Sequence, residues 1–351
     1  MTLAARSTQM TQRERVFAVI HGEAVDRPPV SVWRHFPEID MTAEGLADAT
    51  VAFQRRFDWD LVKFMPPGIY SIVDYVVETD WVPNDHGVRT VRALRVTHPE
   101  QWRDLPRLDA RSGFLGQQNR AMAQAIDRLG SDVPVLQTIF SPLTTARKLA
   151  GNAVFAHLRA DPVGFGEAFE RIVETTIDLV RDAIEVGGGV FYATQCATGD
   201  TLSEAELQAW EFEPARRILA GARDTASPVI VHVHGEAPSL HGFAELGIDG
   251  LNWHDRTGRP SLAEARRLFP ERLLVGGIDG WGALLHGDAA EIHAQVGDSL
   301  QQTKSARVLL APGCVISTDA TDQQLDVLRA ASHSAADELP HRAVNGREAV
   351  S

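Results

Sequence analysis

The sequence predicts a (β/α)8 barrel, in which eight parallel strands alternate with helices. Eight short apolar segments are separated by longer amphipathic stretches, a pattern typical of parallel strands covered on both faces. A chain of 351 residues is long enough for one barrel with insertions. A doubly wound open sheet is the alternative, and the absence of a G-x-G-x-x-G after the first segment disfavours it. The eight segments are Pro29–Trp33, Asp60–Phe64, Val133–Phe140, Val190–Thr194, Val229–His234, Ile248–Trp253, Leu273–Ile278 and Val308–Ala311.

Amphipathic stretches between these segments predict the outer helices. Apolar residues in Phe169–Val186 recur at helical spacing. The stretch Ser203–Ala220 opens with Ser203 and Glu206 at the spacing of a capping box. Leu262–Phe269 and Ala289–Ser299 fit the same pattern. Each helix follows a predicted strand, as a barrel requires.

Both ends of the chain and one long gap depart from this alternation. Met10–Gly22 predicts an extra helix, capped by Thr11 and closed by Gly22. The gap at 65–132 contains two β-rich stretches around Asn84–Gly87, which predict a β-hairpin inserted after the second strand and folded over the mouth of the barrel. We expect residues 1–9 and 339–351 to be loose tails around one domain, 10–338.

Composition restricts the partners of this protein. The chain is 44% hydrophobic and 23% charged, with a net charge of −13 and no block of basic residues. Nucleic acids and anionic membranes are therefore poor partners. Two cysteines provide no disulfide framework, which favours a reducing cytoplasm. The N-terminus lacks the apolar core of a signal peptide, and no apolar run is long enough to span a membrane.

Chemistry in a barrel sits where the strands end, and that rule selects the candidate residues. We expect Glu236 to act as a proton acceptor, with His35 and Tyr192 as further catalytic candidates. The expected substrate-binding residues are Arg34, Gln195, Asn252 and Asp279, and Arg34 in particular is expected to clamp an anion through its planar guanidinium. Other polar or sulfur-containing residues at strand ends are Lys63, Met65, Gln137, Ser141, Cys196, His254, Asp255, Cys314, Ser317 and Asp319.

His232 and His234 are the strongest single signal. Residues i and i+2 of a strand point to the same face, so both imidazoles face the barrel axis while Val231 and Val233 face the helices. A thiolate from another strand end would complete a three-ligand zinc site with an open fourth position. Cys314, after the eighth strand, is the preferred sulfur ligand, and Cys196 is the alternative. A polar pocket without metal also explains the two histidines.

Several segments resemble the uroporphyrinogen decarboxylase superfamily over residues 11–335. The N-terminal TQRERVFAVIHGEAVDRPPVSVWRH resembles the opening of that family, and GIDGLNWHDRTGRPSLAEARRLFPERLLVGGID resembles its later strand–helix–strand unit. VHVHG stands where the methyltransferase branch has His-x-Cys-Gly, and LAPGCVIS resembles that branch's Ala-Pro-Gly-Cys segment. The resemblance implies Zn²⁺ held by His232, His234 in place of a cysteine, and Cys314, with a corrinoid protein as methyl carrier.

Departures from the true decarboxylase affect the expected substrate. That enzyme has a second arginine four residues after the first, where this chain has Glu38, and an aspartate after the second strand, where this chain reads Lys63–Pro67. Uroporphyrinogen is therefore not the expected substrate. The leading expectation is a zinc-dependent methyltransferase acting on a small molecule. The alternatives are a decarboxylase or lyase on a small acid held by Arg34 and a protonated His35, and a non-catalytic binding protein. A homo-oligomer is compatible with the sequence.

Overall fold

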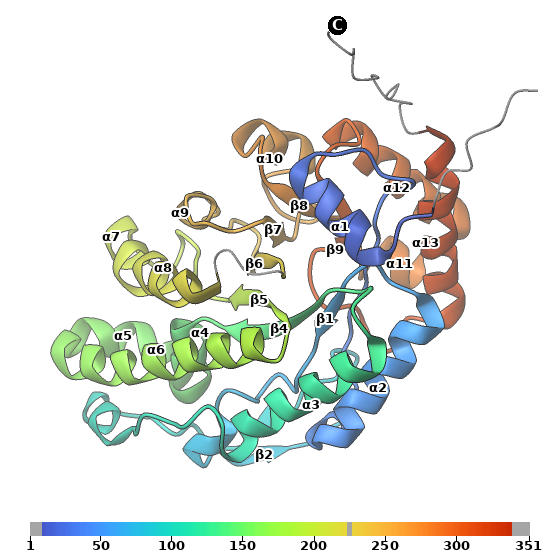
Figure 1. The fold of residues 1–351 in the computed structure, drawn as a ribbon. Helices are drawn as coiled ribbons and strands as arrows, with labels where there is room; N and C mark the ends of the chain where they lie inside the picture. The colour runs from blue at the N-terminus through green and yellow to red at the C-terminus, as the bar shows by residue number, and fades with distance from the viewer. Residues whose placement is uncertain (1–8, 223–226, 339–351) are drawn as a thin grey trace, which may run out of the picture.

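A computed structural model describes residues 9–222 and 227–338 and shows seven parallel strands in one curled sheet (Figure 1). Within this sheet the strands lie side by side in the order in which they occur in the chain, so the order has no reversal. A doubly wound sheet reverses its strand order, and that alternative is excluded. The strands are β1 (Val62–Phe64), β4 (Val135–Phe140), β5 (Gly189–Thr194), β6 (Val229–Val233), β7 (Gly250–Trp253), β8 (Leu273–Ile278) and β9 (Val308–Pro312).

The first predicted strand closes the barrel without forming a full strand. Val30 makes an isolated parallel bridge to Leu310 of β9, and on the other side the Val30 carbonyl accepts a hydrogen bond from the Asp60 amide. The segment therefore lies between β9 and β1. It lacks a regular ladder because Pro28 and Pro29 have no amide hydrogen, and the Val30 amide donates instead to the Asp60 carboxylate at 2.7 Å. The (β/α)8 barrel is confirmed, with its first strand reduced to a bridge.

Helices surround the strands on the outside, as Figure 1 shows. The predicted N-terminal helix is confirmed: α1 is capped by Thr11 and ends at Gly22, whose φ is 75°. The Ser203 capping box is also confirmed, although a π-helical segment, Gln208–Phe212, divides the predicted helix into α7 and α8. The helices are α1 (Gln12–His21), α2 (Ala43–Phe57), α3 (Gly113–Leu129), α4 (Pro142–Ala150), α5 (Val154–Ala160), α6 (Pro162–Glu185), α7 (Glu204–Leu207), α8 (Glu213–Leu219), α9 (His241–Ala244), α10 (Leu262–Leu268), α11 (Ala283–His286), α12 (Ala289–Thr303) and α13 (Asp322–Ser334).

Side chains inside the barrel are apolar at one end and polar at the other. Val16 and Val19 of α1 pack with Leu61, Ile230 and Leu309 in one buried cluster, so α1 covers the end where the strands begin. This arrangement seals that end. Polar side chains such as His35, Thr138 and His232 line the cavity at the opposite end, where the strands finish.

The insertion after β1 contains the predicted hairpin. Strands β2 (Thr79–Asp80) and β3 (Thr90–Val91) pair antiparallel. The Thr318 amide, which follows β9 in the chain, donates a hydrogen bond to the Asp85 carbonyl at 2.8 Å, and the His86 ring lies 4.3 Å from the Trp281 ring. The hairpin thus folds over the mouth of the barrel.

The expected tails, residues 1–9 and 339–351, fall almost wholly outside the described residues. Within the described ranges, no helix combines the length and apolarity needed to cross a membrane.

Candidate metal centre and its cavity

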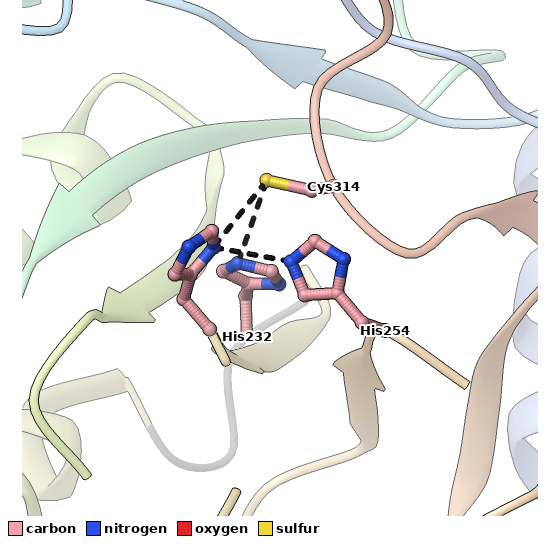
Figure 2. A group of neighbouring side chains, drawn as sticks. His232, His254 and Cys314 are labelled. Carbon is pink, nitrogen blue, oxygen red and sulfur yellow. Dashed lines mark hydrogen bonds between the residues drawn. The ribbon is translucent and has the colours of Figure 1, made fainter. Parts of the chain in front are cut away.

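Four side chains from three strand ends meet at the mouth of the barrel: His232 and His234 from β6, His254 after β7, and Cys314 after β9. One potential ligand atom of each lies within 4.8 Å of the others. The Cys314 sulfur is 3.8 Å from His232 Nε2 and 3.8 Å from His234 Nδ1, and His234 Nδ1 is 3.1 Å from His254 Nε2. Figure 2 shows His232, His254 and Cys314 pointing toward one another. We call these four residues the His/Cys cluster.

Strand geometry brings the three histidines together. His232 faces the barrel interior, while Val231 and Val233 belong to the cluster packed under the helices, as the alternation predicts. In the parallel pairing of β6 with β7, His232 is the partner of Asn252, and continuing that register places His234 beside His254.

Cys314 reaches the cluster because a glycine precedes it. A Cβ atom on Gly313 would lie 2.6 Å from the Trp253 carbonyl oxygen and 2.8 Å from the His254 Cα. The loop after β9 therefore passes directly against the backbone after β7, which any other residue would obstruct. This close approach carries the Cys314 sulfur across the mouth of the barrel to the histidines.

The cluster suits a tetrahedral metal ion. Bond lengths of zinc proteins place two nitrogen ligands about 3.3 Å apart, and a nitrogen and a sulfur about 3.6 Å apart, at tetrahedral angles. The distances of 3.1 and 3.8 Å are close to these values. Three imidazoles with one thiolate are also donors that zinc prefers. The residues present therefore fit the metal that the resemblance implies.

The low pKa values of His232 and His234 favour binding of a metal over binding of a proton. Burial, followed by the charge of Lys63, lowers the pKa of His232 well below its ordinary value. Burial and His254 lower the pKa of His234 to about 4. Both rings are neutral and offer lone pairs. Burial raises the pKa of Cys314, so metal binding at neutral pH must release the thiol proton.

Asn252 holds His232 in place. Its Oδ1 lies 2.7 Å from His232 Nδ1, which leaves Nε2 directed toward Cys314. The Asn252 amide donates to the carbonyls of Val275 and Pro312, so it ties β6 to β8 and β9. Asn252 is fully buried and does not line the cavity. Asn252 was expected to bind substrate, but its side chain contacts His232 rather than the cavity, which is the position that groups behind metal-binding histidines commonly occupy.

Directly above the cluster is a cavity of about 360 Å³, which is at the small end of ligand pockets. The hairpin insertion covers one side of it through His86, Val88 and Arg89. Two expected site residues, His35 and Gln195, line it. The other lining residues are Lys63, Met65, Pro66, Gly68, Ile69, Ile72, Val91, Thr138, Phe140, Lys148, Ala193, His232, His234, His254, Trp281, Cys314 and Val315.

Arg34 points away from this cavity, contrary to expectation. Its guanidinium lies 5.2 Å from the Phe53 ring centre, and it lines a separate hollow of only about 20 Å³ that has room for little more than a water molecule. His35 is also not the expected cation. Burial and the charge of Lys63 lower its pKa to about 3, so the ring is neutral. The structure therefore does not bring Arg34 and a protonated His35 together as an anion clamp in this cavity.

Three further candidates lie outside the cavity. Tyr192 is fully buried under the helices, with its ring 6.5 Å from that of Phe243, because it occupies the outward face of β5. Glu236 is exposed. Asp279 accepts hydrogen bonds from the amides of Trp281 and Gly282 and so shapes the turn after β8. The structure therefore does not place these three residues against a substrate in this cavity.

The alternative sulfur ligand, Cys196, is not part of the cluster. It is buried, and desolvation together with the neighbouring Glu211 raises the pKa of its thiol to about 12. Of the two cysteines, Cys314 is the one beside the histidines, as preferred from the sequence.

Two parts of the site were not predicted from the sequence. His254 was recognised only as a strand-end residue, although its place beside His234 follows from aligning the ends of β6 and β7. Lys148 lies on α4 rather than at a strand end, so the rule that barrel sites form at strand ends does not predict it.

Comparison with known proteins agrees with the fold. The profile of the family Uroporphyrinogen decarboxylase (URO-D) matches residues 11–335. The chain belongs to the uroporphyrinogen decarboxylase family. The family match spans the barrel, the hairpin insertion and all four members of the His/Cys cluster.

Individual relatives are distant. A uroporphyrinogen decarboxylase of Rhizorhabdus wittichii is 24% identical over 75% of this chain and 81% of its own, and one of Anaeromyxobacter sp. is 24% identical over 70% and 72%. Among solved structures, a methyltransferase from Methanosarcina mazei has the same fold, with a TM-score of 0.80, 20% identity, and coverage of 94% of this chain and 99% of that one.

Proposed function

We propose that this member of the uroporphyrinogen decarboxylase family is a zinc-dependent methyltransferase acting on a small molecule. The observation that carries the proposal is the His/Cys cluster on the wall of a small cavity at the active end of the barrel. Zinc bound there would supply a Lewis acid that lowers the pKa of an acceptor thiol or hydroxyl. The fold shared with the Methanosarcina mazei methyltransferase supports methyl transfer as the reaction.

Cluster residues have different tasks in this proposal. His232, His234 and Cys314 are the three expected ligands, and Asn252 fixes the first of them. The ring of His254 has no hydrogen bond to a described residue other than His234. His254 would therefore be the fourth residue to hold the metal, and the one that an acceptor atom of the substrate could most readily replace.

The methyl carrier in this proposal is a corrinoid protein that docks at the mouth of the barrel. We place the protein in the reducing cytoplasm, an inference that rests on its two free cysteines.

The alternative, a decarboxylase acting on a small acid, requires Arg34 and a protonated His35 to hold the acid. Arg34 lies outside the cavity and His35 is neutral, so neither residue supports this alternative. Uroporphyrinogen itself, with four pyrrole rings and eight carboxylates, is a poor match for a cavity of about 360 Å³. We therefore infer a smaller substrate than the names of the curated relatives would imply.

The test is methyl transfer from free methylcobalamin to small thiols and alcohols by the zinc-loaded protein. Loss of methylcobalamin is followed by absorbance, and the methylated product by mass spectrometry. Metal-free protein and Cys314→Ala serve as controls. We expect only the zinc-loaded wild type to catalyse methyl transfer from methylcobalamin. Release of CO₂ from a small acid, without methyl transfer, would assign the alternative lyase activity.

A further inference from the structure

We propose that Glu211 is a positioning residue of the cavity, which fixes the backbone of Gln195 through Ser141 and Thr144. Gln195 lines the cavity, whereas the other three residues lie behind its wall. No part of the proposed function uses Glu211. The proposal rests on that function only for the reaction whose rate is measured as a second readout.

A π-helical segment, Gln208–Phe212, turns Glu211 toward the barrel. Its hydrogen bonds span one residue more than those of an α-helix, and such turns often occur at functional sites. Glu213, two positions later, is exposed, as a glutamate on a surface helix usually is. Glu211 is instead fully buried. A buried carboxyl group is costly unless it has hydrogen-bond partners, so its surroundings indicate what it does.

Hydrogen bonds connect Glu211 to the cavity wall in three steps. Glu211 Oε1 lies 3.3 Å from Ser141 Oγ, which lies 2.9 Å from Thr144 Oγ1. The Thr144 hydroxyl oxygen accepts a hydrogen bond from the Gln195 amide at 2.8 Å. Glu211, Ser141 and Thr144 are all fully buried, so water does not compete for these bonds. The chain of bonds ends at the residue that lines the cavity.

The number of hydrogens determines how these bonds run. The Thr144 amide donates to Ser141 Oγ at 3.1 Å, and the Ser141 hydroxyl has one hydrogen for either Thr144 or Glu211. A protonated Glu211 donates to Ser141, which leaves the Ser141 hydrogen for Thr144. An ionised Glu211 can only accept, and it takes that hydrogen away from Thr144. The complete series of aligned bonds therefore requires a proton on Glu211.

The surroundings of Glu211 favour the protonated form. Burial raises its pKa to about 8, against the opposing effect of the Thr194 and Ser141 hydroxyls. Its second oxygen, Oε2, has no hydrogen-bond partner among the described residues. A neutral carboxyl group tolerates this isolation better than a carboxylate does. Glu211 is therefore mainly protonated at pH 7 and ionised at pH 9.

Two other titratable groups face Glu211, and both stay neutral over this range. They are Tyr192 on β5 and Cys196 after it. Burial, and after it the charge of Glu211, raises the pKa of Tyr192 well above its ordinary value and that of Cys196 to about 12. Neither group can take over the titration of Glu211 between pH 7 and pH 9.

Charged groups on the neighbouring helices have other partners. Arg147 of α4 donates to the Gln195 carbonyl at 3.2 Å, so the backbone of Gln195 is held at both its N–H and its C=O. Lys148 of α4 lies over the Phe140 ring and lines the cavity. The groups on α7, α8 and α9 form ion pairs at the surface: Glu204 with His241, Glu206 with Arg159, and Glu213 with Arg216.

Ionisation of Glu211 should therefore loosen the cavity wall at Gln195. Lys63 and Lys148 line the same cavity, and burial lowers the pKa of each to about 8. The pH dependence of the wild type alone thus does not identify Glu211. A variant that cannot ionise at position 211 separates its contribution from theirs.

The experiment measures hydrogen exchange of the Gln195 amide at pH 6.5 and pH 9 in the zinc-loaded protein. Overlapping peptides analysed by mass spectrometry isolate this amide, and its protection factor corrects for the intrinsic effect of pH. Glu211→Gln keeps a neutral donor of the same shape, and Glu211→Met keeps the length without a donor. Glu213→Gln is the matched control, because it makes the same change at an exposed position of the same helix. Circular dichroism and methyl transfer from methylcobalamin are recorded for each protein.

Protection of Gln195 in the wild type and in Glu213→Gln should fall about tenfold between pH 6.5 and pH 9, the effect of one lost hydrogen bond. In Glu211→Gln it should stay constant, and in Glu211→Met it should be low at both pH values. Methyl transfer should decline less with pH in Glu211→Gln than in the wild type.

An equal fall in protection in the wild type and Glu211→Gln would overturn the proposal. Full protection in a folded Glu211→Met would do the same, and the comparison with Glu211→Gln decides if Glu211→Met does not fold. The expected exchange pattern without methyl transfer in any of the proteins refutes the proposed function alone. Methyl transfer together with equal falls in protection refutes the positioning role alone.

Discussion

Asn252 shows how one buried amide can position a histidine of the His/Cys cluster from outside the cluster. It contacts His232 Nδ1 and is held in turn by the carbonyls of Val275 and Pro312. Metal affinity should therefore depend on Asn252 although it offers the metal no ligand atom. Its strand-end position led to the expectation that Asn252 binds substrate. That position does not reveal that the side chain points inward and is fully buried.

Asn252→Ala should weaken zinc binding about 10- to 100-fold, the usual effect of losing a group that orients a ligand histidine. Competition with a chromophoric chelator measures the affinity. Asn252→Asp is the matched variant, since its carboxylate can still accept the His232 Nδ1–H bond, and it should retain most of the affinity. Unaltered affinity in Asn252→Ala would mean that packing alone orients His232.

Glu211 is a second residue whose environment determines its behaviour. It is fully buried in the π-helical segment, Ser141 Oγ lies 3.3 Å from its Oε1, and burial raises its pKa to about 8. The native state keeps a proton on Glu211 that the unfolded chain releases above its ordinary pKa of 4.5. The stability supplied by this group is therefore complete below pH 4.5 and is lost as pH rises through about 8.

Glu211→Gln removes this titration. Relative to the wild type, the variant should gain about 3 kcal/mol in free energy of unfolding between pH 5.5 and pH 8.5. Urea unfolding at the two pH values measures the difference. A constant difference between the two proteins would show that Glu211 is ionised in the native state at both pH values.

At the scale of elements, the hairpin insertion is the part of the fold that encloses the cavity. Its tip is fitted closely to the barrel: a Cβ atom on Gly87 would lie 2.9 Å from Thr318 Cγ2 and 3.0 Å from His35 Cβ. Gly87 also has a φ of 69°. The tip therefore cannot accept a side chain without moving away from the mouth.

Gly87→Ala should displace the hairpin and speed alkylation of Cys314 in the metal-free protein. Gly130→Ala is the control, because Gly130 has a φ of 77° but nothing within 4 Å of its added Cβ. Both variants should lose stability through backbone strain, and Gly130→Ala should lose about 1–3 kcal/mol because its ψ of −165° at a positive φ suits essentially only glycine. Only Gly87→Ala should expose Cys314. Equal alkylation rates, measured by mass spectrometry, would show that the hairpin does not shield the site.

For the whole molecule, stability and function are concentrated at opposite ends of the barrel. Asp60, just before β1, is fully buried and accepts hydrogen bonds from Arg15, Arg27 and the Val30 amide. This network joins α1 to the segment that closes the barrel. The His/Cys cluster lies at the other end, where the strands finish.

Asp60→Ala should lower the free energy of unfolding by about 3–5 kcal/mol, because it leaves the buried Arg27 guanidinium without its carboxylate partner and leaves Arg15 with Asp26 alone. Zinc bound per folded molecule should not change. Chemical unfolding and metal analysis of the same preparation measure both quantities. A large loss of zinc from protein that is still folded would contradict the separation of the two ends.

Strand periodicity accounts for what the sequence could predict about this fold and site. Alternation placed His232 inside the barrel, and the strand-end rule led to Cys314. Neither rule describes what a side chain meets beyond its own strand, so Arg34 was assigned to the cavity although it packs on Phe53. Lys148 was missed for the same reason, since α4 brings it to the cavity from the helix layer.

Zinc content shows directly whether the His/Cys cluster is a metal centre. Purified wild type, loaded with zinc and then dialysed, should hold one zinc per chain, and X-ray absorption should show sulfur at about 2.3 Å and nitrogen at about 2.0–2.1 Å. Cys314→Ala should lose the metal while remaining folded, and Cys196→Ala should keep it. Full zinc occupancy in Cys314→Ala, or no zinc retained by the wild type, would contradict the assignment of the His/Cys cluster as a metal centre.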